Sequence, residues 1–255
     1  LISLYRDLYK YPIIASIRRR NDNSTSLITI NNEFEKELKA TRFLGVGNPS
    51  ESGVHMLYYF RQECQLSKEY FINTSDIFTT HKIEEVLQDN SSRTYLKSEI
   101  TNSEITRYIF IDDFCGSGSQ AESYLKNIVE NIKFENPKIE VSYLMLFGTE
   151  NGIRAVRSLG VFDSVEAVFT IDETFKTFSE NSRYFKTVPN SIIDKNFSKE
   201  TALKYGMHLF NPPLGYGNCE LLLGMNHNTP DNSLPIFWSR QNNWKPIFKR
   251  YNKIY

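Results

Sequence analysis

The stretch YIFIDDFCGSGSQAESYL, residues 108–125, decides the fold expected of this chain. Its apolar start indicates a buried strand that ends in two adjacent carboxylates, Asp112 and Asp113. A loop of small residues follows, and residues 119–134 have the apolar spacing of an amphipathic helix. Because ligands of open α/β sheets bind beyond the carboxyl ends of the strands, the acidic pair is expected to face a ligand.

The small-residue loop between this strand and helix is suited to binding phosphate. It consists of Cys115, Gly116, Ser117, Gly118 and Ser119. Successive backbone N–H groups at the start of a helix form an anion site. A carboxylate beside a phosphate would repel it, so the acidic pair should face hydroxyl groups. A sugar with neighbouring hydroxyls and a 5′-phosphate satisfies both requirements.

The surrounding sequence predicts a parallel sheet. Further strands are expected at 138–149 and 164–174, with a helix at 151–160 between them. Strands that alternate with helices over short links are typical of an α/β fold whose sheet is covered on both faces, with right-handed crossovers. The predicted fold is therefore α/β, with a mostly parallel sheet flanked by helices.

The other segments are predicted from weaker patterns. Helices are expected at 1–20, with a break near Pro12, at 31–40 from an Asn cap, at 51–63 and at 81–89. A strand and turn are expected at 68–78, a polar connector at 90–104 and a strand at 219–226. One structural domain is predicted, with an N-terminal helical segment (1–40), an α/β core (41–175) and a C-terminal hood (176–255).

Composition excludes several classes of protein. The chain has 30 Lys and Arg residues and 30 Asp and Glu residues. Its net charge is therefore zero and does not point to nucleic acid or membrane as a partner. Three dispersed cysteines fit neither a disulfide framework nor a zinc site, which predicts a reducing, cytoplasmic location. Neither a signal peptide nor an apolar run of about 20 residues is present. The chain starts at Leu1 rather than Met, so upstream residues are expected to be missing.

The acidic loop resembles the ribose-5-phosphate loop of type I phosphoribosyltransferases. That pattern has two acids, three variable residues, Thr-Gly and a further Thr. Here Ser117 and Gly118 stand at Thr-Gly, and Gln120 replaces the last Thr. The resemblance implies that Asp112 and Asp113 bind the ribose hydroxyls and stabilise positive charge at C1′. Mg²⁺ would bridge pyrophosphate and ribose, so the acids would contact the metal indirectly, through phosphoribosyl pyrophosphate or a nucleotide.

A second small-residue loop precedes the helix predicted at 51–63. Its candidate binding residues are Gly47, Asn48, Ser50, Ser52 and Gly53. In phosphoribosyltransferases the first such loop holds pyrophosphate through backbone amides. No Lys or Arg lies inside it here, and the candidates for a nearby cation are Arg61, Arg93 and Lys97. The alternative is an ordinary loop with a helix cap at Ser50 or Ser52.

The tail segment GMNHNTPDNSLPIFW, residues 224–238, carries polar side chains suited to specific contacts. The candidates are His227, Asn228, Asp231 and Asn232. With DDFCGSGS and NPSESG, this tail resembles the phosphoribosyltransferase-like effectors of bacterial conflict systems, some of them retron-associated. The resemblance implies a toxic effector of anti-phage defence held in check by partners, either a reverse transcriptase with its RNA or DNA or a winged-helix protein.

Several other interpretations stay open. The fold could serve as a nucleotide-binding module without turnover. Residues 116–121 also satisfy G-x-G-x-x-A, the dinucleotide pattern, which alone is weak. DDFCGSG resembles the DPFCGSG motif of amino-group DNA methyltransferases, and FNPPL, residues 210–214, resembles their NPPY. Finally, the loop could be only a helix cap and tight turn.

Overall fold

A computed structural model describes residues 1–21, 26–48, 51–86, 92–186, 192–225 and 228–251. The chain forms two compact units that interleave along the sequence. Unit 1 comprises Leu1–Asp113, Gln120–Leu146 and Val156–Val168, and unit 2 comprises Phe114–Ser119, Phe147–Ala155 and Phe169–Tyr255. The predicted division at about residues 40 and 175 stays a prediction.

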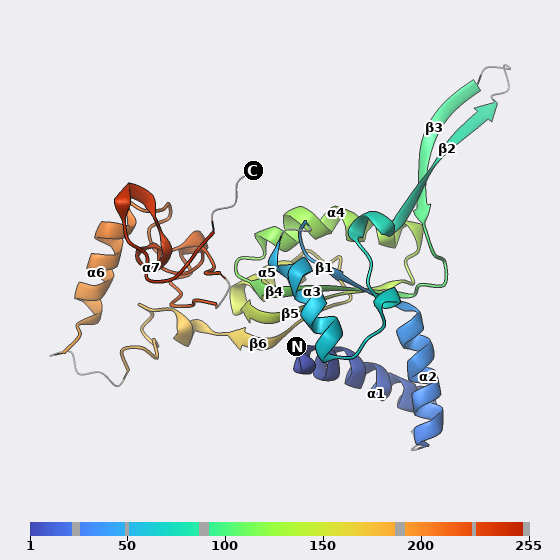
Figure 1. Cartoon of the computed structure of the whole chain (residues 1–255), viewed down its shortest axis with the longest axis horizontal. Coiled ribbons are helices and arrows are strands. Elements are labelled where there is room, and N and C mark those ends of the chain that lie inside the picture. The colour runs from blue at the N-terminus through green and yellow to red at the C-terminus, as the bar shows by residue number, and fades with distance from the viewer. Residues whose placement is uncertain (22–25, 49–50, 87–91, 187–191, 226–227, 252–255) are drawn as a thin grey trace. The chain divides into compact units, whose positions relative to one another are not determined.

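A parallel sheet carries the core of the chain (Figure 1). Its strands follow the order β1-β4-β5-β6, and their bounds are Thr41–Gly45, Arg107–Cys115, Glu140–Thr149 and Ser164–Ile171. Strand β1 pairs in parallel with β4, with Gly45 beside Ile111. Helices α4 (Ser119–Glu135) and α5 (Glu150–Ser158) join the later strands. The predicted α/β fold is confirmed.

The N-terminal segment is helical, as expected, but differs in detail. A π-helix at Leu4–Lys10 leads into α1, Tyr11–Arg20. Pro12 is the second residue of α1, directly after the π-helix, and the residues on both sides of it are helical, so the chain changes from π-helix to α-helix near Pro12 without a break. Helix α2 runs over Leu27–Lys39, and its cap is Ser26, so the predicted Asn cap was wrong.

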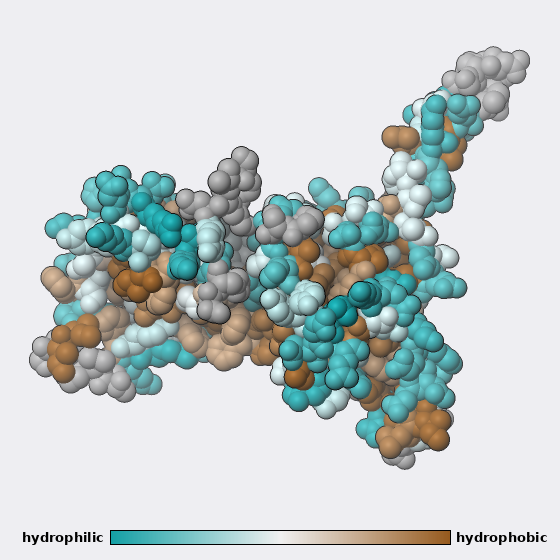
Figure 2. Space-filling model, in the orientation of Figure 1, coloured by the Kyte–Doolittle hydropathy of each residue, from teal (hydrophilic) through white to brown (hydrophobic). Residues whose placement is uncertain are grey.

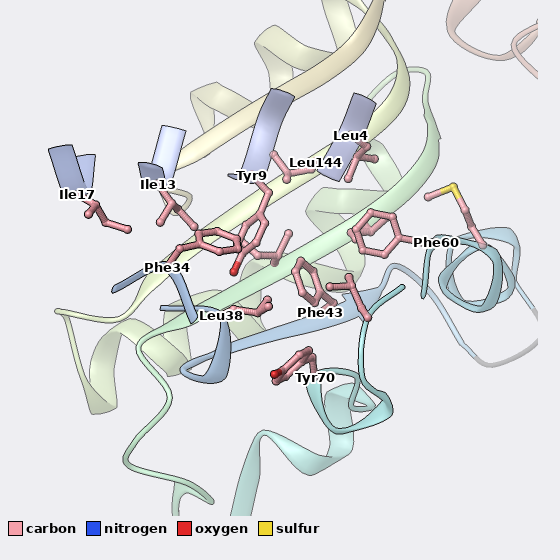
Figure 3. Close-up of a cluster of buried hydrophobic side chains, with 14 residues drawn as sticks. Leu4, Tyr9, Ile13, Ile17, Phe34, Leu38, Phe43, Phe60, Tyr70 and Leu144 are labelled. Atoms are coloured by element: carbon pink, nitrogen blue, oxygen red, sulfur yellow. The ribbon is translucent and has the colours of Figure 1, made fainter. Parts of the chain in front are cut away.

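These helices bury a large apolar cluster of unit 1 against β1, β4 and helix α3, Ser52–Glu63 (Figure 3). Its buried members are Leu4, Tyr9, Ile13, Ile17, Phe34, Leu38, Phe43, Met56, Phe60, Leu66, Tyr70, Ile109, Ile111 and Leu144. The Tyr9 ring meets Phe43 edge-on, with centroids 5.1 Å apart, and its hydroxyl donates to Thr41 Oγ1 at 3.0 Å. The N-terminal helices are therefore part of this core.

The segment between α3 and β4 was wrongly predicted. Residues 68–78 form two short 3₁₀ helices, Lys68–Tyr70 and Thr74–Asp76, instead of a strand and turn. The predicted helix at 81–89 and connector at 90–104 are, where described, an antiparallel hairpin of β2 (Phe78–Val86) and β3 (Ser92–Ile100). Its strands are largely exposed on both faces. They therefore lack the alternation of apolar and polar residues by which a half-buried strand is predicted from a sequence.

Unit 2 is built mostly from short elements around a small apolar cluster. It includes most of α5 together with helices α6 (Lys195–Gly206) and α7 (Pro235–Trp238), and the buried cluster residues are Phe178, Ala202, Leu214 and Leu234. The strand predicted at 219–226 was wrong, because in its described part Leu221 makes only isolated bridges, to Lys176 and Ser233. Over the residues that the structure describes, no helix could span a membrane.

The apolar cluster of unit 1 predicts a large cost for truncating its central ring. Phe43 is 0% exposed on β1, so Phe43→Ala removes a full aromatic side chain and leaves a cavity. We expect the free energy of unfolding to fall by about 3–5 kcal/mol, measured by urea denaturation. Phe134→Ala, at a residue 85% exposed, is the matched control and should change it little. Equal losses in both variants would contradict this account of the core.

Candidate functional site

The acidic pair lies on β4, and its two side chains have different surroundings. Asp112 is 3% exposed, whereas Asp113 is half-buried. The Tyr143 hydroxyl, from β5, donates to Asp112 Oδ2 at 2.7 Å, and the backbone N–H of Asp113 donates to Asp112 Oδ1 at 2.9 Å. Asp112 is therefore fixed inside unit 1, and Asp113 is the more accessible carboxylate.

Burial also changes the pKa of Asp112. Loss of hydration, with the neighbouring negative charge of Asp113, raises the pKa of Asp112 well above its usual value. The hydrogen bond from Tyr143 lowers this pKa but does not outweigh burial. The neutral form of Asp112 is thus favoured over a wider pH range than for an ordinary aspartate.

The start of α3 lies against this pair. The Ser52 hydroxyl donates to Asp113 Oδ1 at 2.9 Å. Gly53 is needed beside it, because a Cβ there would lie 2.6 Å from the Val46 carbonyl oxygen and 3.3 Å from Asp112 Oδ1. Two stretches that the sequence singled out, 47–53 and 112–113, therefore meet within unit 1. The helix cap is Glu51, so Ser52 is not the cap.

Glu51 is a site residue that the sequence analysis missed. Its carboxylate reaches into the loop against Gly47 and accepts a hydrogen bond from Gln120 Nε2 at 3.1 Å. Its backbone N–H donates to the Asn48 carbonyl at 2.9 Å. Gln120, which stands where phosphoribosyltransferases have Thr, thus contacts the first loop. The available signal was that Glu51 is the only acid in NPSESG; Ser50 lies outside the described residues.

The three cations suggested near this loop have other contacts. Arg61 lies over the Tyr58 ring at 6.0 Å, and Lys97 pairs with Glu99 at 2.6 Å. Arg93 is an exposed residue of β3, opposite Glu85 of β2. None of these contacts involves the first loop, and the predicted role of a basic residue there is not supported by them.

Unit 2 contains the predicted phosphate loop and holds it from two sides. The Thr149 hydroxyl donates to the Gly116 carbonyl and accepts from the Gly152 N–H at 2.9 Å. On the other side, the Asn232 amide lies so close to Gly116 that a Cβ there would collide with it. The backbone at Gly116 is therefore fixed by side chains from distant parts of the sequence.

The other residues of this loop have contacts mainly through their serine hydroxyls. The hydroxyls of Ser117 and Ser119 are hydrogen-bonded at 2.9 Å, and Tyr216 reaches Ser119 Oγ at 3.5 Å. Cys115 is buried, and Gly118 lies in the turn before α4. The two serine hydroxyls and the turn are compatible with the predicted anion contact, which stays a prediction.

The tail residues divide into two groups. Asn232 Nδ2 donates to the Tyr216 carbonyl at 3.2 Å and contacts Cys219 Sγ at 3.4 Å, and its amide lies against Gly116, so it links the tail to the phosphate loop. Asp231 and Asn228 instead hold the C-terminal segment, through Arg250 at 2.8 Å and the N–H of Tyr251 at 3.2 Å respectively. His227 lies outside the described residues.

A cavity of about 320 Å³ opens within unit 2. Two of its lining residues are tied to the phosphate loop, since Thr149 bonds Gly116 and Cys219 contacts Asn232. The lining is mostly polar and carries charges of both signs: Thr149, Glu150, Asn151, Arg154, Ile171, Asp172, Glu173, Lys176, Cys219 and Leu221. The cavity could accept a small polar molecule next to the loop.

The described residues contain no cluster of three or more His, Cys, Asp or Glu side chains that could hold a metal ion by themselves. Asp113 accepts a hydrogen bond from Ser52, and Glu51, which precedes Ser52 in the chain, accepts one from Gln120. Magnesium commonly uses one or two carboxylates together with phosphate oxygens and water. This donor set fits a metal that a phosphate ligand brings with it.

Burial of Asp112 predicts a pH dependence of stability. Its pKa is raised in the folded state above the usual 3.8, so the folded state binds more protons and stability falls as pH rises through this window. Asp112→Asn removes the titration and keeps the shape. We expect the melting temperature of the variant, relative to the unsubstituted chain, to rise as the pH increases above about 4. A difference that does not change with pH would contradict the assigned burial.

Partial likenesses to solved structures were found, all at low identity. The AQ2163 protein from Aquifex aeolicus is 12% identical, with a TM-score of 0.32 over 53% of this chain and 56% of that one. Orotate phosphoribosyltransferase from Aeropyrum pernix is 14% identical, with a TM-score of 0.29 over 53% and 63%. The xanthine-guanine-hypoxanthine phosphoribosyltransferase of Helicobacter pylori is 12% identical, with a TM-score of 0.27 over 58% and 89%.

The present chain thus spans less than two thirds of the length of the first two of these proteins. No curated protein matches it in sequence. The profile of the PRTase-CE family, a phosphoribosyltransferase-like domain, matches residues 1–250, nearly the whole chain. The strand, acidic pair and small-residue loop thus lie within that match, and the chain belongs to the PRTase-CE family.

Proposed function

We propose that this chain binds a ribose 5-phosphate compound, phosphoribosyl pyrophosphate or a nucleotide, and catalyses transfer or hydrolysis at C1′. The observation that carries the proposal is the hydrogen bond between Ser52 and Asp113. It joins the loop expected to hold pyrophosphate to the carboxylate expected to hold ribose. In phosphoribosyl pyrophosphate the pyrophosphate is bound to C1′ of the ribose, and the nearest ribose hydroxyl is on the neighbouring C2′.

The two acids would have different roles in this reaction. Asp113 would accept hydrogen bonds from the ribose hydroxyls and offset positive charge that develops at C1′. Asp112 would act as a positioning residue, because it accepts the N–H of Asp113 and is itself fixed by Tyr143. The backbone amides of residues 115–119, which follow directly in the chain, would bind the 5′-phosphate.

Magnesium would reach the site on the ligand. Asp113 would contact it together with oxygens of the pyrophosphate and ribose, and Glu51, against Gly47 of the first loop, is the second candidate carboxylate. When bound, the ion would neutralise negative charge on the leaving pyrophosphate. The Gly47–Gly53 loop would bind the same group through its amides, with no Lys or Arg of its own to assist.

The cavity of unit 2 is proposed to bind a small polar molecule. Its lining offers cations at Arg154 and Lys176 and carboxylates at Glu150, Asp172 and Glu173. Such a lining suits a small molecule with both donor and acceptor groups better than an apolar one.

The biological role is proposed from the resemblance described above. The chain would act as a toxic effector of a retron-type anti-phage system, held in check by a partner. Its partners would be a reverse transcriptase with its RNA or DNA, or a winged-helix protein. The substrate would then be a nucleotide whose loss stops growth of the infected cell.

A second function, nucleotide binding without turnover, is favoured by the position of Glu51. Its carboxylate lies against Gly47, inside the loop expected to hold pyrophosphate. A negative charge there disfavours a free pyrophosphate and favours one that carries a metal ion. A nucleoside monophosphate, which lacks pyrophosphate, would not meet this carboxylate, and the domain would then act as a sensor.

The binding step can be tested by thermal stabilisation with phosphoribosyl pyrophosphate and Mg²⁺, nucleoside monophosphates, NAD and S-adenosylmethionine. A ligand at 100 times its Kd adds about 2.7 kcal/mol, which raises the melting temperature measurably. We expect a shift with phosphoribosyl pyrophosphate or a nucleotide that is lost in Asp113→Asn. The amide oxygen of this variant can still accept from Ser52, so the fold should be kept. Glu122→Gln, at an exposed residue of α4, is the control.

Turnover separates the two functions. Release of pyrophosphate or of a free base by the unsubstituted chain, lost in Asp113→Asn, would support catalysis. Stabilisation without any release would favour the sensor. A shift with S-adenosylmethionine alone would contradict both and would favour the methyltransferase interpretation of DDFCGSG.

A further inference from the structure

The zero net charge of the chain results from an uneven distribution of charge along the sequence. Residues 195–255 contain eight Lys and Arg residues against three Asp and Glu residues, and residues 1–194 contain 22 against 27. After Asp231 no further acid follows, and the last 24 residues of the sequence carry five cations interleaved with six aromatic residues. Cations interleaved with aromatic rings are typical of surfaces that bind nucleic acid.

Four exposed side chains of unit 2 form a basic–aromatic strip, which consists of Lys245, Phe248, Lys249 and Tyr251. Phe248 is 41% exposed and Tyr251 66%. Within the part of the chain that the structure describes, neither lysine has an ion pair. Figure 2 shows hydrophilic residues over much of the region of α6 and α7, with hydrophobic ones between them. The charges of the two lysines are therefore available to an anionic partner.

The backbone of the strip is held by other parts of unit 2. The N–H groups of Ile247 and Phe248 both donate to the Phe237 carbonyl, at 2.8 and 2.9 Å. The Thr229 hydroxyl donates to the Lys249 carbonyl at 2.8 Å. The side chains of the strip thus extend from an ordered backbone, which reduces the entropy that a partner would have to remove on binding.

The Phe248 ring is supported by the chain and still exposed. A Cβ added at Gly224 would lie 3.3 Å from this ring, so glycine lets the ring pack closely there. The Phe237 ring lies beside it, with centroids 6.2 Å apart. A ring that is fixed by its neighbours and partly open to solvent is suited to stack on an unpaired base.

A further pair of rings lies next to the strip, at the end of α6. Tyr205 is 43% exposed, and its ring centroid is 5.4 Å from that of Trp244. The Lys204 ammonium lies 5.7 Å from the Tyr205 ring centroid. Because Trp244 directly precedes Lys245, these groups extend the same surface with another cation and another exposed ring.

Single-stranded nucleic acid fits this surface better than other anionic partners. Its phosphates match the lysines, and its unpaired bases have free faces that can stack on the rings. In a duplex the bases are already stacked on one another, and their faces are covered. Segments that lie on a membrane are typically amphipathic helices, whereas the structure has no helix over residues 245–251. An acidic peptide would match the lysines but would leave the rings without flat partners.

We propose that unit 2 binds single-stranded nucleic acid along the basic–aromatic strip. Lys245 and Lys249 contact its phosphates, and Phe248 and Tyr251 stack on its bases. These groups contact the phosphates and the faces of the bases, which all sequences share, so binding is tolerant of sequence. The proposal rests on this surface and not on the reaction proposed at C1′.

The test titrates the full chain against labelled oligo(dT) of about 20 nucleotides, by fluorescence anisotropy at several salt concentrations. The unsubstituted chain should bind, and more weakly as salt rises. Lys245→Glu combined with Lys249→Glu should raise the Kd about tenfold or more at low salt, and loss of two phosphate contacts should make the slope of log K against log salt shallower by about 1.4. Tyr251→Ala should raise the Kd about fivefold or more.

Matched controls make the same changes at exposed residues of unit 1. Lys68→Glu combined with Lys138→Glu, and Phe134→Ala alone, should leave the Kd close to that of the unsubstituted chain. Melting temperatures of all variants show whether the fold is kept. Asp113→Asn should bind oligo(dT) as the unsubstituted chain does, so failure of this proposal and failure of the proposed reaction are distinguished.

Four results would overturn the proposal. The first is no binding of oligo(dT) by the unsubstituted chain, with or without binding of vesicles of phosphatidylserine and phosphatidylcholine. The second is binding of a duplex of the same length, or of inorganic polyphosphate, as tight as that of oligo(dT). The third is an unchanged Kd in the double lysine variant. The fourth is loss of binding in Asp113→Asn, which would place the strand at the proposed active site.

Discussion

The parallel pairing of β1 with β4 is the constraint on which the candidate site depends. Gly45 lies beside Ile111, and the Val46 N–H donates to the Ile111 carbonyl at 3.1 Å, so both strands end at the same edge. Each strand is followed at once by one of the two small-residue stretches. Gly53 then lets α3 begin close to Val46, and this approach brings Ser52 to Asp113. A one-residue slip in the pairing would separate the loop from the acid.

A second constraint is the cost of placing two carboxylates next to each other in a site proposed to bind a phosphate compound. The chain meets it by burying Asp112 with Tyr143, which favours the neutral form of that acid. A neutral Asp112 would repel a phosphate ligand less than a charged one would, and the buried acid still accepts the N–H of its neighbour Asp113.

The buried parts of the fold could be predicted from the sequence, because a strand covered on both faces reads as an apolar run. The strand expected at 107–114 and the helix at 119–134 match Arg107–Cys115 and Ser119–Glu135 closely. The contacts that complete the site could not be predicted this way. Tyr143 and Asn232 reach Asp112 and Gly116 from distant positions in the sequence, and only the tertiary fold brings them there.

The errors have a common physical cause. The predictions for residues 81–100 and 219–226 were wrong because the pattern of burial in these segments does not follow their secondary structure. In the hairpin, exposure of both faces removes the period of two that marks a strand, and Glu84 and Glu85 then favour a helix. The hairpin was therefore mistaken for a helix and a connector because its exposure, and not its backbone, departs from the pattern of a half-buried strand.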